Sequence, residues 1–190
     1  MIGSDGILQL LKLCQANDLP LVDWGCGVCN VLAVAALAGV EIRGVELVPG
    51  YYEGAEQLFA HLGLDEQFGG IELGDLFGWS VPDTPAIYFI NNEKLQELGS
   101  HLLEKILTLA VGSIVVTLVR LPMSDASGRP LPRSNRAAGA WGALRHPVQH
   151  RVMMSDWSPR TLTYSDCMSE ACTVSWGRYA KYPYHVYTVS

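Results

Sequence analysis

The chain has 190 residues, of which 49% are hydrophobic and 17% are charged, so it can bury a sizeable core and lacks the composition of a disordered protein. Its most apolar run, residues 107–119, is interrupted by threonine, glycine and serine and is too short and too polar to span a bilayer. The N-terminus has no basic flank leading into an apolar stretch, so we expect no secretory signal. These features argue against a membrane-spanning or secreted protein and predict one soluble, intracellular domain over residues 1–190.

The charge is distributed unevenly along the chain. Residues 1–119 contain 4 Lys/Arg and 15 Asp/Glu, a net charge of −11, whereas residues 120–190 contain 9 and 4, a net charge of +5. Such asymmetry is typical of an acidic body with a basic face that meets an anionic partner. The alternative is an ordinary solvated loop, and the composition alone does not decide between the two.

Short apolar runs alternate with helical patterns in the first two thirds of the chain. The longest helical stretch, 93–109, has apolar residues at a spacing of 3.6, and Gly39 and Pro49 stand where helices end and begin. In chain order the pattern predicts a strand at 19–24, a helix at 30–37, a strand at 41–47, a helix at 49–62, strands at 70–73 and 86–90, a helix at 93–109 and a strand at 113–121. This alternation predicts an α/β fold, a mostly parallel sheet with helices on both faces.

The pattern changes after residue 121. Residues 125–151 combine prolines, glycines and serines with five arginines, and a segment this long and irregular is usually functional or disordered. We therefore expect an irregular basic loop at about 123–151. Three β-like runs follow it, at 160–164, 173–176 and 184–189, and they predict antiparallel strands added to the sheet edge.

The five cysteines have no regular disulfide spacing, and Cys26 and Cys29 form the chain's one CxxC. A redox pair or half of a zinc site is one interpretation, but no second CxxC or pair of histidines completes such a site. The other interpretation is that both cysteines are small apolar residues that fill a glycine-rich turn. We favour the second interpretation and expect no metal.

A glycine turn, Gly25-x-Gly27, follows the first predicted strand and precedes the first helix of the alternating pattern. Glycine allows a tight turn and close approach of a ligand, and the helix N-terminus supplies unpaired N–H groups. Glu46 ends the next strand, where a carboxylate can accept hydrogen bonds from both hydroxyls of a ribose. The combination predicts an adenosine-containing cofactor; the alternative is a packing turn beside a surface glutamate.

The same region favours S-adenosylmethionine over NAD. A dinucleotide fingerprint has a third glycine, which is absent after Gly27. S-adenosylmethionine has no pyrophosphate but carries an amino group and a positive sulfur, and Asp23 at the strand end is suited to attract them. Asp75, which follows the third strand, is suited to pair with the adenine amino group, with Leu76 packing on the base.

Asn91 and Asn92 end the predicted strand at 86–90, and ligands of open α/β sheets bind beyond the carboxyl ends of strands. Methyl transfer to an amine requires a neutral nucleophile, alignment and a dry channel. The amide oxygen of Asn91 can hold an amine without carrying charge, so the protein needs no general base. The other interpretation of the pair is a helix N-cap, and Asn92 is suited to that role for the helix that follows.

Aromatic residues gather near the C-terminus, at Trp176, Tyr179, Tyr182, Tyr184 and Tyr187. Aromatic walls suit a lysine channel, because they pack on the methylene stem and their π faces tolerate cationic methylated amines. Their alternation is equally typical of core packing in a strand.

Together these motifs resemble the disruptor-of-telomeric-silencing family of histone lysine methyltransferases, which have a class I methyltransferase fold in place of a SET domain. The resemblance spans about residues 7–120 and 173–189. It rests on Val22–Val28, Gly44–Leu47, Gly74–Leu76, Ile87–Asn92, Val174–Trp176 and Tyr184–Val189. The glycine loop is common to many methyltransferases, whereas the Asn-Asn motif combined with the terminal Val-Ser-Trp hairpin is more specific to this family.

The resemblance implies contacts with S-adenosylmethionine from Asp23, Gly25, Gly27, Asn30, Glu46, Asp75 and Leu76. It implies that Asn91 lies beside the transferring methyl and that Trp176 and Tyr184 line the lysine channel. The alignment near Tyr184 needs a gap of one, which leaves Tyr182 as an alternative. Known members modify a lysine in the core domain of histone three on the nucleosome, and they bind DNA and the histone acidic patch through basic elements.

This chain departs from the family in three places. Cys29 and Asn30 stand where the family has glycine and glutamine, and Glu93 follows the Asn pair where an apolar aromatic is usual. The tyrosine–glycine–glutamate–threonine segment that covers the cofactor in the family has no match here. We therefore expect either a minimal chain or a different segment that closes the site.

The leading hypothesis is a nuclear, S-adenosylmethionine-dependent methyltransferase of a nucleosomal histone lysine. On this hypothesis Arg133, Arg136 and Arg145 of the basic loop contact nucleosomal DNA or the histone acidic patch, and such phosphate contacts weaken steeply with salt. The alternatives are a protein-lysine methyltransferase of broader specificity, which would be cytoplasmic, and a cofactor-binding pseudoenzyme that acts as an interaction module.

Overall fold

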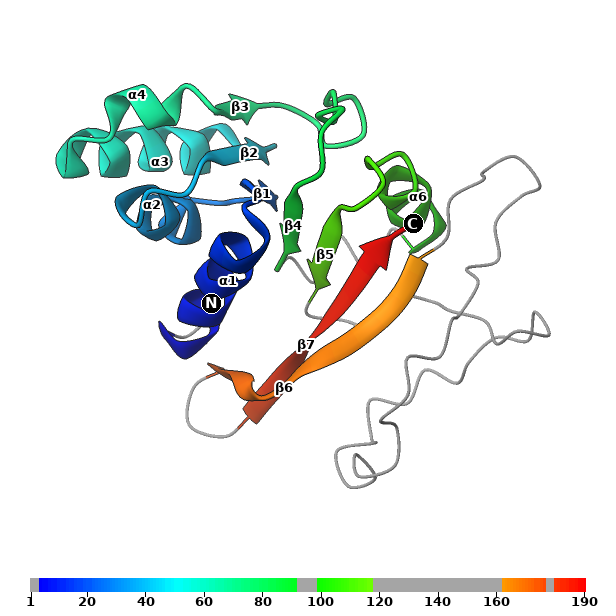
Figure 1. Cartoon of the computed structure of the whole chain (residues 1–190). Coiled ribbons are helices and arrows are strands. Elements are labelled where there is room, and N and C mark those ends of the chain that lie inside the picture. Colours follow the sequence, from blue (N-terminus) through cyan, green and yellow to red (C-terminus); the bar gives the residue numbers. More distant parts are fainter. Residues whose placement is uncertain (1–3, 92–98, 118–161, 177–179) are drawn as a thin grey trace.

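The computed structural model of the chain describes residues 4–91, 99–117, 162–176 and 180–190. Its strands are β1 Leu21–Trp24, β2 Ile42–Glu46, β3 Ile71–Leu73, β4 Ile87–Ile90, β5 Ile114–Thr117, β6 Leu162–Trp176 and β7 Ala180–Val189. They form one seven-stranded sheet in the order β3-β2-β1-β4-β5-β7-β6 (Figure 1). The first five strands pair in parallel, and β7 joins β5 and β6 in antiparallel orientation. The structure thus confirms the predicted parallel sheet with an antiparallel C-terminal hairpin.

The helices are α1 Ser4–Asn17, α2 Asn30–Leu37, α3 Pro49–Leu62, α4 Asp65–Phe68 and α6 Gly99–Ile106. Two of them, α2 and α3, have the bounds predicted from the sequence, because local signals set their ends. Gly39 and Gly63 adopt positive φ after the two helices, and Pro49 is the first residue of α3. The helices α1 and α4 were not predicted from the sequence. None of the helices in the described part of the chain has the length and hydrophobicity of a membrane span.

The expected helix at 93–109 ends earlier than predicted in the structure. Residues 92–98 lie outside the described part of the chain, and α6 ends at Ile106, three residues before the predicted end. Thr108 N–H donates to the carbonyl of Lys105, and Leu109 N–H to that of Ile106. These bonds span three residues instead of four, so the helical pattern closes as a tighter turn. Leu109 is still buried, which explains why the apolar period continues beyond the helix.

The β-like runs expected at 160–164 and 173–176 belong to one strand. β6 runs continuously from Leu162 to Trp176 along β7. Its pairing register shifts twice, between Tyr164 and Asp166 and between Met168 and Thr173. Irregularities of this kind place extra residues in one strand without ending it, so the interruption of the sequence pattern marks shifts in register and not a loop.

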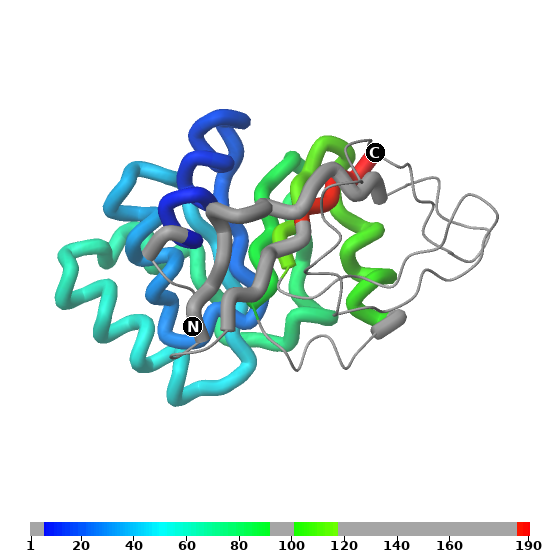
Figure 2. Tube along the Cα trace, turned by 90° about the horizontal axis from the view of Figure 1, so that it is seen from below, coloured from blue at the N-terminus to red at the C-terminus, as the bar shows by residue number. Residues whose placement is uncertain are grey.

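Helices cover both faces of the sheet. Alternate residues of each strand face opposite sides, so Leu21 and Phe89 join a core beneath α1, α2 and α3, whereas Val22 and Tyr88 join a second core beneath α6. Figures 1 and 2 show this separation, with the blue and cyan helices on one side of the sheet and the green α6 on the other. The carboxyl ends of the parallel strands between these layers form the edge at which Asp23, Glu46 and Asn91 lie.

Two buried polar atoms in the second core have no hydrogen-bond partner, Nε1 of Trp24 and the hydroxyl of Tyr88. Both side chains are fully buried, and their rings meet edge to face with centroids 5.1 Å apart. Burial raises the pKa of Tyr88 to about 12, although Arg43 opposes that effect, so the hydroxyl is neutral. The pair is held by ring packing and not by hydrogen bonds.

We therefore expect Tyr88→Phe to leave the free energy of unfolding unchanged or to raise it by up to about 1 kcal/mol, because it removes a buried hydroxyl that has no partner. Tyr88→Leu is the control: it also removes the ring and is expected to cost about 2–3 kcal/mol. Urea unfolding measures both. A loss above about 1 kcal/mol for Tyr88→Phe would show that the hydroxyl is hydrogen-bonded, for example to a buried water.

Candidate functional site

The turn after β1 has the conformation that its glycines predict. Gly25 has φ 75° and Gly27 has φ 58°, a region that residues with a side chain rarely adopt. Gly25 N–H donates to the carbonyl of Val45 on β2 at 2.9 Å, which fixes the turn to the neighbouring strand. A Cβ built on Gly27 would meet no atom within 4 Å. The turn is therefore anchored below and open above, so a ligand can approach its backbone.

Cys29 adopts φ 59° at the start of α2, with its side chain fully buried. Its N–H donates to the carbonyl of Cys26 at 2.9 Å, and its Sγ lies 3.7 Å from the carbonyl oxygen of Gly27. A hydrogen bond with the Cys29 thiol, followed by burial, raises the pKa of Cys26 far above its usual value. The two thiols therefore pack against each other inside the turn, in agreement with the packing interpretation. Among the described residues no group of three or more potential ligands could hold a metal ion.

Glu46, the last residue of β2, braces the glycine turn. Its Oε2 accepts a hydrogen bond from the N–H of Gly27 at 2.8 Å, and its Oε1 accepts one from the N–H of Val48, also at 2.8 Å. The carboxylate is 6% exposed, and each oxygen retains a second lone pair. Glu46 thus holds the turn and the start of α3 together while keeping acceptor capacity at the sheet edge, a double role that sequence reasoning did not identify.

Asp23 is the second buried acid at this edge, 4% exposed and close to Glu46. Burial, followed by repulsion from the Glu46 carboxylate, raises the pKa of Asp23 to about 8. Neither acid forms an ion pair within the described part of the chain. Two buried carboxyl groups without a cationic partner create a site that favours a positively charged ligand group.

The segment after β3 forms a tight turn beside Glu46. Gly74 N–H donates to the main-chain carbonyl of Glu46 at 2.9 Å, and Oδ1 of Asp75 accepts from Phe77 N–H at 3.0 Å. Asp75 is exposed, whereas Leu76 is only 6% exposed and packs in the second core. Among the apolar side chains that are exposed near these strand ends are Leu47 and Phe77, besides Val48 and Leu73. Sequence reasoning missed Leu47 and Phe77, although Leu47 directly follows the predicted ribose acid.

The strand register brings Asn91 and Tyr184 to the same edge. Ile90 pairs with Thr117 on β5, and Thr117 pairs with His185 on β7. Because β7 runs antiparallel, Asn91 and Tyr184 are each the next residue beyond this row, with backbones two strand spacings, about 10 Å, apart. Asn91 is half-buried. The backbone therefore brings together two residues that are 93 positions apart in the sequence.

Trp176 lies farther out on the hairpin. It pairs with Ala180, which is four residues, or about 14 Å along an extended strand, from Tyr184. The hairpin runs beyond the edge toward α1, and β6 contacts α1 (Figure 1). Of the other predicted residues, Asn30 is the exposed first residue of α2. Outside the described part of the structure lie Asn92, Arg133, Arg136 and Arg145 and the side chains of Trp176, Tyr182 and Tyr184.

Comparisons with known proteins find likeness in structure only. No protein-family model matches the chain, and no curated protein matches it by sequence. Among solved structures, an RNA methyltransferase from Salinibacter ruber in complex with S-adenosyl-L-homocysteine is 19% identical, with a TM-score of 0.51, and the match covers 70% of this chain and 95% of that protein.

Two further solved structures have the same fold. A SAM-dependent methyltransferase from Geobacter sulfurreducens in complex with S-adenosyl-L-homocysteine is 20% identical over 61% of this chain and 48% of its own, with a TM-score of 0.50. A geranyl diphosphate methyltransferase in complex with SAM is 22% identical over 58% and 46%, also with a TM-score of 0.50. The chain thus spans less than half the length of these two proteins. These likenesses show that the chain has the Rossmann-like fold of class I methyltransferases.

Proposed function

We propose that the chain is a methyltransferase that uses S-adenosylmethionine. The observation that carries this proposal is the gathering of two buried acids, a glycine turn of positive φ and an exposed aspartate at one sheet edge, in a class I methyltransferase fold. The ligands named for structures of this fold, S-adenosylmethionine and S-adenosyl-L-homocysteine, agree in chemistry with such a site. When bound, the cofactor supplies an electrophilic methyl group on a positive sulfur.

The described residues divide the recognition of this cofactor among them. Asp23 attracts the amino group of the methionine moiety, because a buried carboxylate near a second acid gains most from a cationic partner. Glu46 accepts hydrogen bonds from the ribose hydroxyls through its remaining lone pairs, and Asp75 accepts one from the adenine amino group. Leu47 and Phe77 supply exposed apolar surface for the base, while Leu76 supports the turn from below.

For the acceptor we propose a lysine side-chain amine. The support is the Asn-Asn motif after β4 and the family resemblance of the terminal hairpin, together with the backbone positions of Asn91 and Tyr184 at one edge. The amide oxygen of Asn91 would hold the neutral amine in line with the methyl group. Tyr184 would border the channel that keeps water away from it, and the family resemblance assigns Trp176, which lies farther out on the hairpin, to the same channel.

We further propose a nucleosomal histone as the protein that carries this lysine, by resemblance the globular region of histone three, and hence a nuclear location. The support is the family resemblance and the net charge of +5 over residues 120–190, against −11 over residues 1–119. Arg133, Arg136 and Arg145 would contact DNA phosphates or the histone acidic patch. Broader protein-lysine specificity and a cofactor-binding pseudoenzyme are the alternatives.

Transfer of a labelled methyl group to nucleosomes, free histones, unrelated proteins and RNA tests these proposals together. Labelling of nucleosomes alone is the expected result, and Asn91→Ala should abolish it while leaving cofactor binding within about 3-fold. Labelling of all the proteins would establish broad specificity, and labelling of RNA alone would replace the lysine proposal. Cofactor binding without transfer to any acceptor would establish the pseudoenzyme.

The basic loop has its own test. Reversing the charge of Arg133, Arg136 and Arg145 should reduce nucleosome labelling at least 10-fold and flatten its dependence on salt, because phosphate contacts carry that dependence. Labelling of a short peptide that contains the target lysine should remain within 2-fold. Unchanged activity on nucleosomes would remove the loop from the proposal.

The cysteine pair is expected to matter little for transfer. Cys29→Ser keeps the shape of the side chain in a slightly smaller volume and places a hydroxyl in the position of the thiol near the carbonyl of Gly27, so methyl transfer under reducing conditions should stay within about 2-fold of the unmodified chain. The measurement is the initial rate with labelled cofactor. A loss above 10-fold would contradict the packing interpretation and would point to a chemical role for the thiol.

A further inference from the structure

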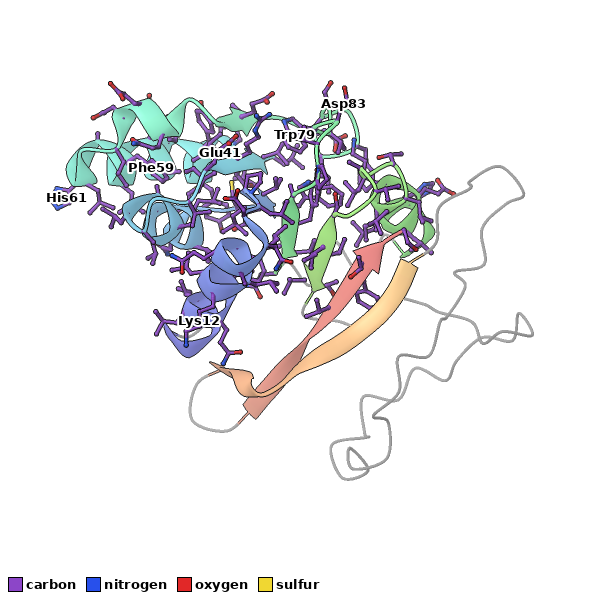
Figure 3. All side chains as sticks on the ribbon, in the orientation of Figure 1. Lys12, Glu41, Phe59, His61, Trp79 and Asp83 are labelled. Atoms are coloured by element: carbon purple, nitrogen blue, oxygen red, sulfur yellow. The ribbon has the colours of Figure 1, made fainter. Side chains whose placement is uncertain are left out.

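Trp79 joins the turn after β3 to α6 on the far side of the second core. Its indole Nε1 donates to Oε1 of Glu72 at 2.8 Å, and its carbonyl oxygen accepts from Nζ of Lys105 at 2.5 Å. The tryptophan side chain is 8% exposed, and Figure 3 shows it beyond the ends of β2 and β3, toward α6. One residue of the turn is thus held from two directions, by the preceding strand and by a helix 26 residues away in sequence.

The same residue closes the turn that carries Asp75. Trp79 N–H and Gly78 N–H both donate to the carbonyl of Asp75 at 3.0 Å. Lys105 therefore holds the end of the turn through the carbonyl of Trp79, and its charge also interacts with the Asp75 carboxylate. Burial lowers the pKa of Lys105, and the attraction of Asp75 opposes this effect. Because the partly buried ammonium of Lys105 donates to the main-chain carbonyl of Trp79, it fixes the position of the backbone at the end of the turn.

We propose that Lys105, acting through Trp79, is a positioning residue that sets the place of Asp75 and thereby the selectivity of the site for adenine. The inference rests on the proposed function, since it assumes that Asp75 reads the amino group of the base. Asp75 is exposed, and its carboxylate accepts a hydrogen bond from Phe77 N–H within the same turn. Its position therefore depends on the backbone of the turn, and this backbone is held at Gly74 by Glu46 and at Trp79 by Lys105.

Two nucleosides that differ at one position of the base separate this role from a general loss of stability. S-adenosylhomocysteine presents an amino group to Asp75, whereas S-inosylhomocysteine presents a carbonyl oxygen, which a carboxylate repels. Calorimetric titration of the full chain should show a preference for the adenine compound on the order of 10-fold, given a partly solvated carboxylate. Asp75→Asn should reduce or reverse this preference, because an amide can also donate.

Lys105→Met keeps the length of the side chain and removes its donors. We expect its affinity for S-adenosylhomocysteine to fall roughly 5- to 10-fold while its affinity for S-inosylhomocysteine changes less than 2-fold, so that the preference collapses. Lys105→Arg, which still donates to a carbonyl, should restore most of the preference. Lys12→Met is the matched control: Lys12 is exposed on α1, far from Trp79 (Figure 3), and its loss should leave both affinities unchanged.

The outcomes distinguish this inference from the proposal on which it rests. A Lys105→Met protein with a lowered melting temperature but an unchanged ratio of affinities would reduce Lys105 to a structural role. Equal binding of both nucleosides by the unmodified chain would overturn the inference and the role of Asp75 in adenine recognition, while the methyltransferase proposal would stand. If the unmodified chain binds neither nucleoside, the methyltransferase proposal fails and the inference fails with it.

Discussion

Asp23→Asn is expected to weaken the binding of S-adenosylhomocysteine roughly 10- to 100-fold, and at the same time to stabilise the ligand-free protein at neutral and alkaline pH. The loss of affinity follows because a hydrogen bond to a charged group contributes about 1.5–3 kcal/mol. The gain in stability follows because the substitution removes a buried acid that is 4% exposed and close to Glu46. The carboxyl group of Asp23 thus favours ligand binding but lowers the stability of the folded protein.

The sign of the pH dependence follows from the raised pKa. Asp23 has a pKa of about 8 in the folded chain against 3.8 for a free side chain, so the folded state holds a proton that the unfolded state has released. Stability from this group is fully present below about pH 4 and is lost as pH rises toward about 8, with a slope of up to about 1.4 kcal/mol per pH unit. The Asp23→Asn protein does not lose stability in this way. The difference in free energy of unfolding between it and the unmodified chain should therefore grow across that pH window and then level off.

Urea unfolding of both proteins at several pH values measures this difference. Titration of S-adenosylhomocysteine in buffers of different ionisation enthalpy should show that the unmodified chain releases a proton on binding below about pH 8, because the ammonium group favours the carboxylate. The Asp23→Asn protein should show no such release. Parallel stability curves for the two proteins would contradict the raised pKa, whereas unchanged affinity would contradict the role of Asp23 in recognition.

Replacing Glu46 has the second large effect. Glu46→Ala leaves the N–H groups of Gly27 and Val48 without their carboxylate acceptor, so we expect the free energy of unfolding to fall by about 2–3 kcal/mol. Part of this loss is offset because Asp23 no longer faces a like charge. Binding of S-adenosylhomocysteine should weaken at least 100-fold, since the variant loses the ribose acceptor and the brace of the glycine turn together.

Glu46→Gln separates these two contributions. The amide retains one oxygen acceptor, so it can keep one of the two backbone hydrogen bonds but cannot receive both. We expect about half of the stability loss and an affinity between those of the unmodified chain and Glu46→Ala. Glu41→Ala is the control near the same strand, because Glu41 is exposed and its ion pair with Arg43 lies in solvent. If Glu46→Ala and Glu41→Ala have the same free energy of unfolding, the proposed role of Glu46 in bracing the glycine turn is wrong.

The buried acids Asp23 and Glu46 destabilise the fold around the site, as is typical of functional positions. Buried like charges destabilise a fold, and proteins keep them where a ligand supplies the missing partner. Here the destabilising pair stands next to two glycines and a cysteine of positive φ, so the edge combines electrostatic and conformational cost. A cationic ligand would remove the electrostatic cost when it binds. The affinity of the site for such a ligand is therefore linked to the instability of the site without one.

Several features of the chain follow from its sequence alone. The alternation of strands and helices, the bounds of α2 and α3 and the glycine turn after β1 all depend on signals within a few residues, such as Gly39, Pro49 and the apolar period. Local signals act through backbone conformation, so they need no knowledge of distant partners. The order of acids and amides at successive strand ends also predicts that these residues share one edge of the sheet, because the carboxyl ends of parallel strands lie at the same edge.

Only the tertiary structure decided how the residues at this edge act on one another. The raised pKa of Asp23, the double hydrogen bond of Glu46 and the burial of Leu76 depend on pairing between β1, β2 and the turn after β3. The contact of Lys105 with Trp79 likewise depends on the packing of α6 over the sheet. Burial and charge–charge interactions are set by groups that meet across strands, and a linear pattern cannot specify those distances. The sequence alone determined which residues reach the edge, and the fold decided which of them hold the turn and which remain available to a ligand.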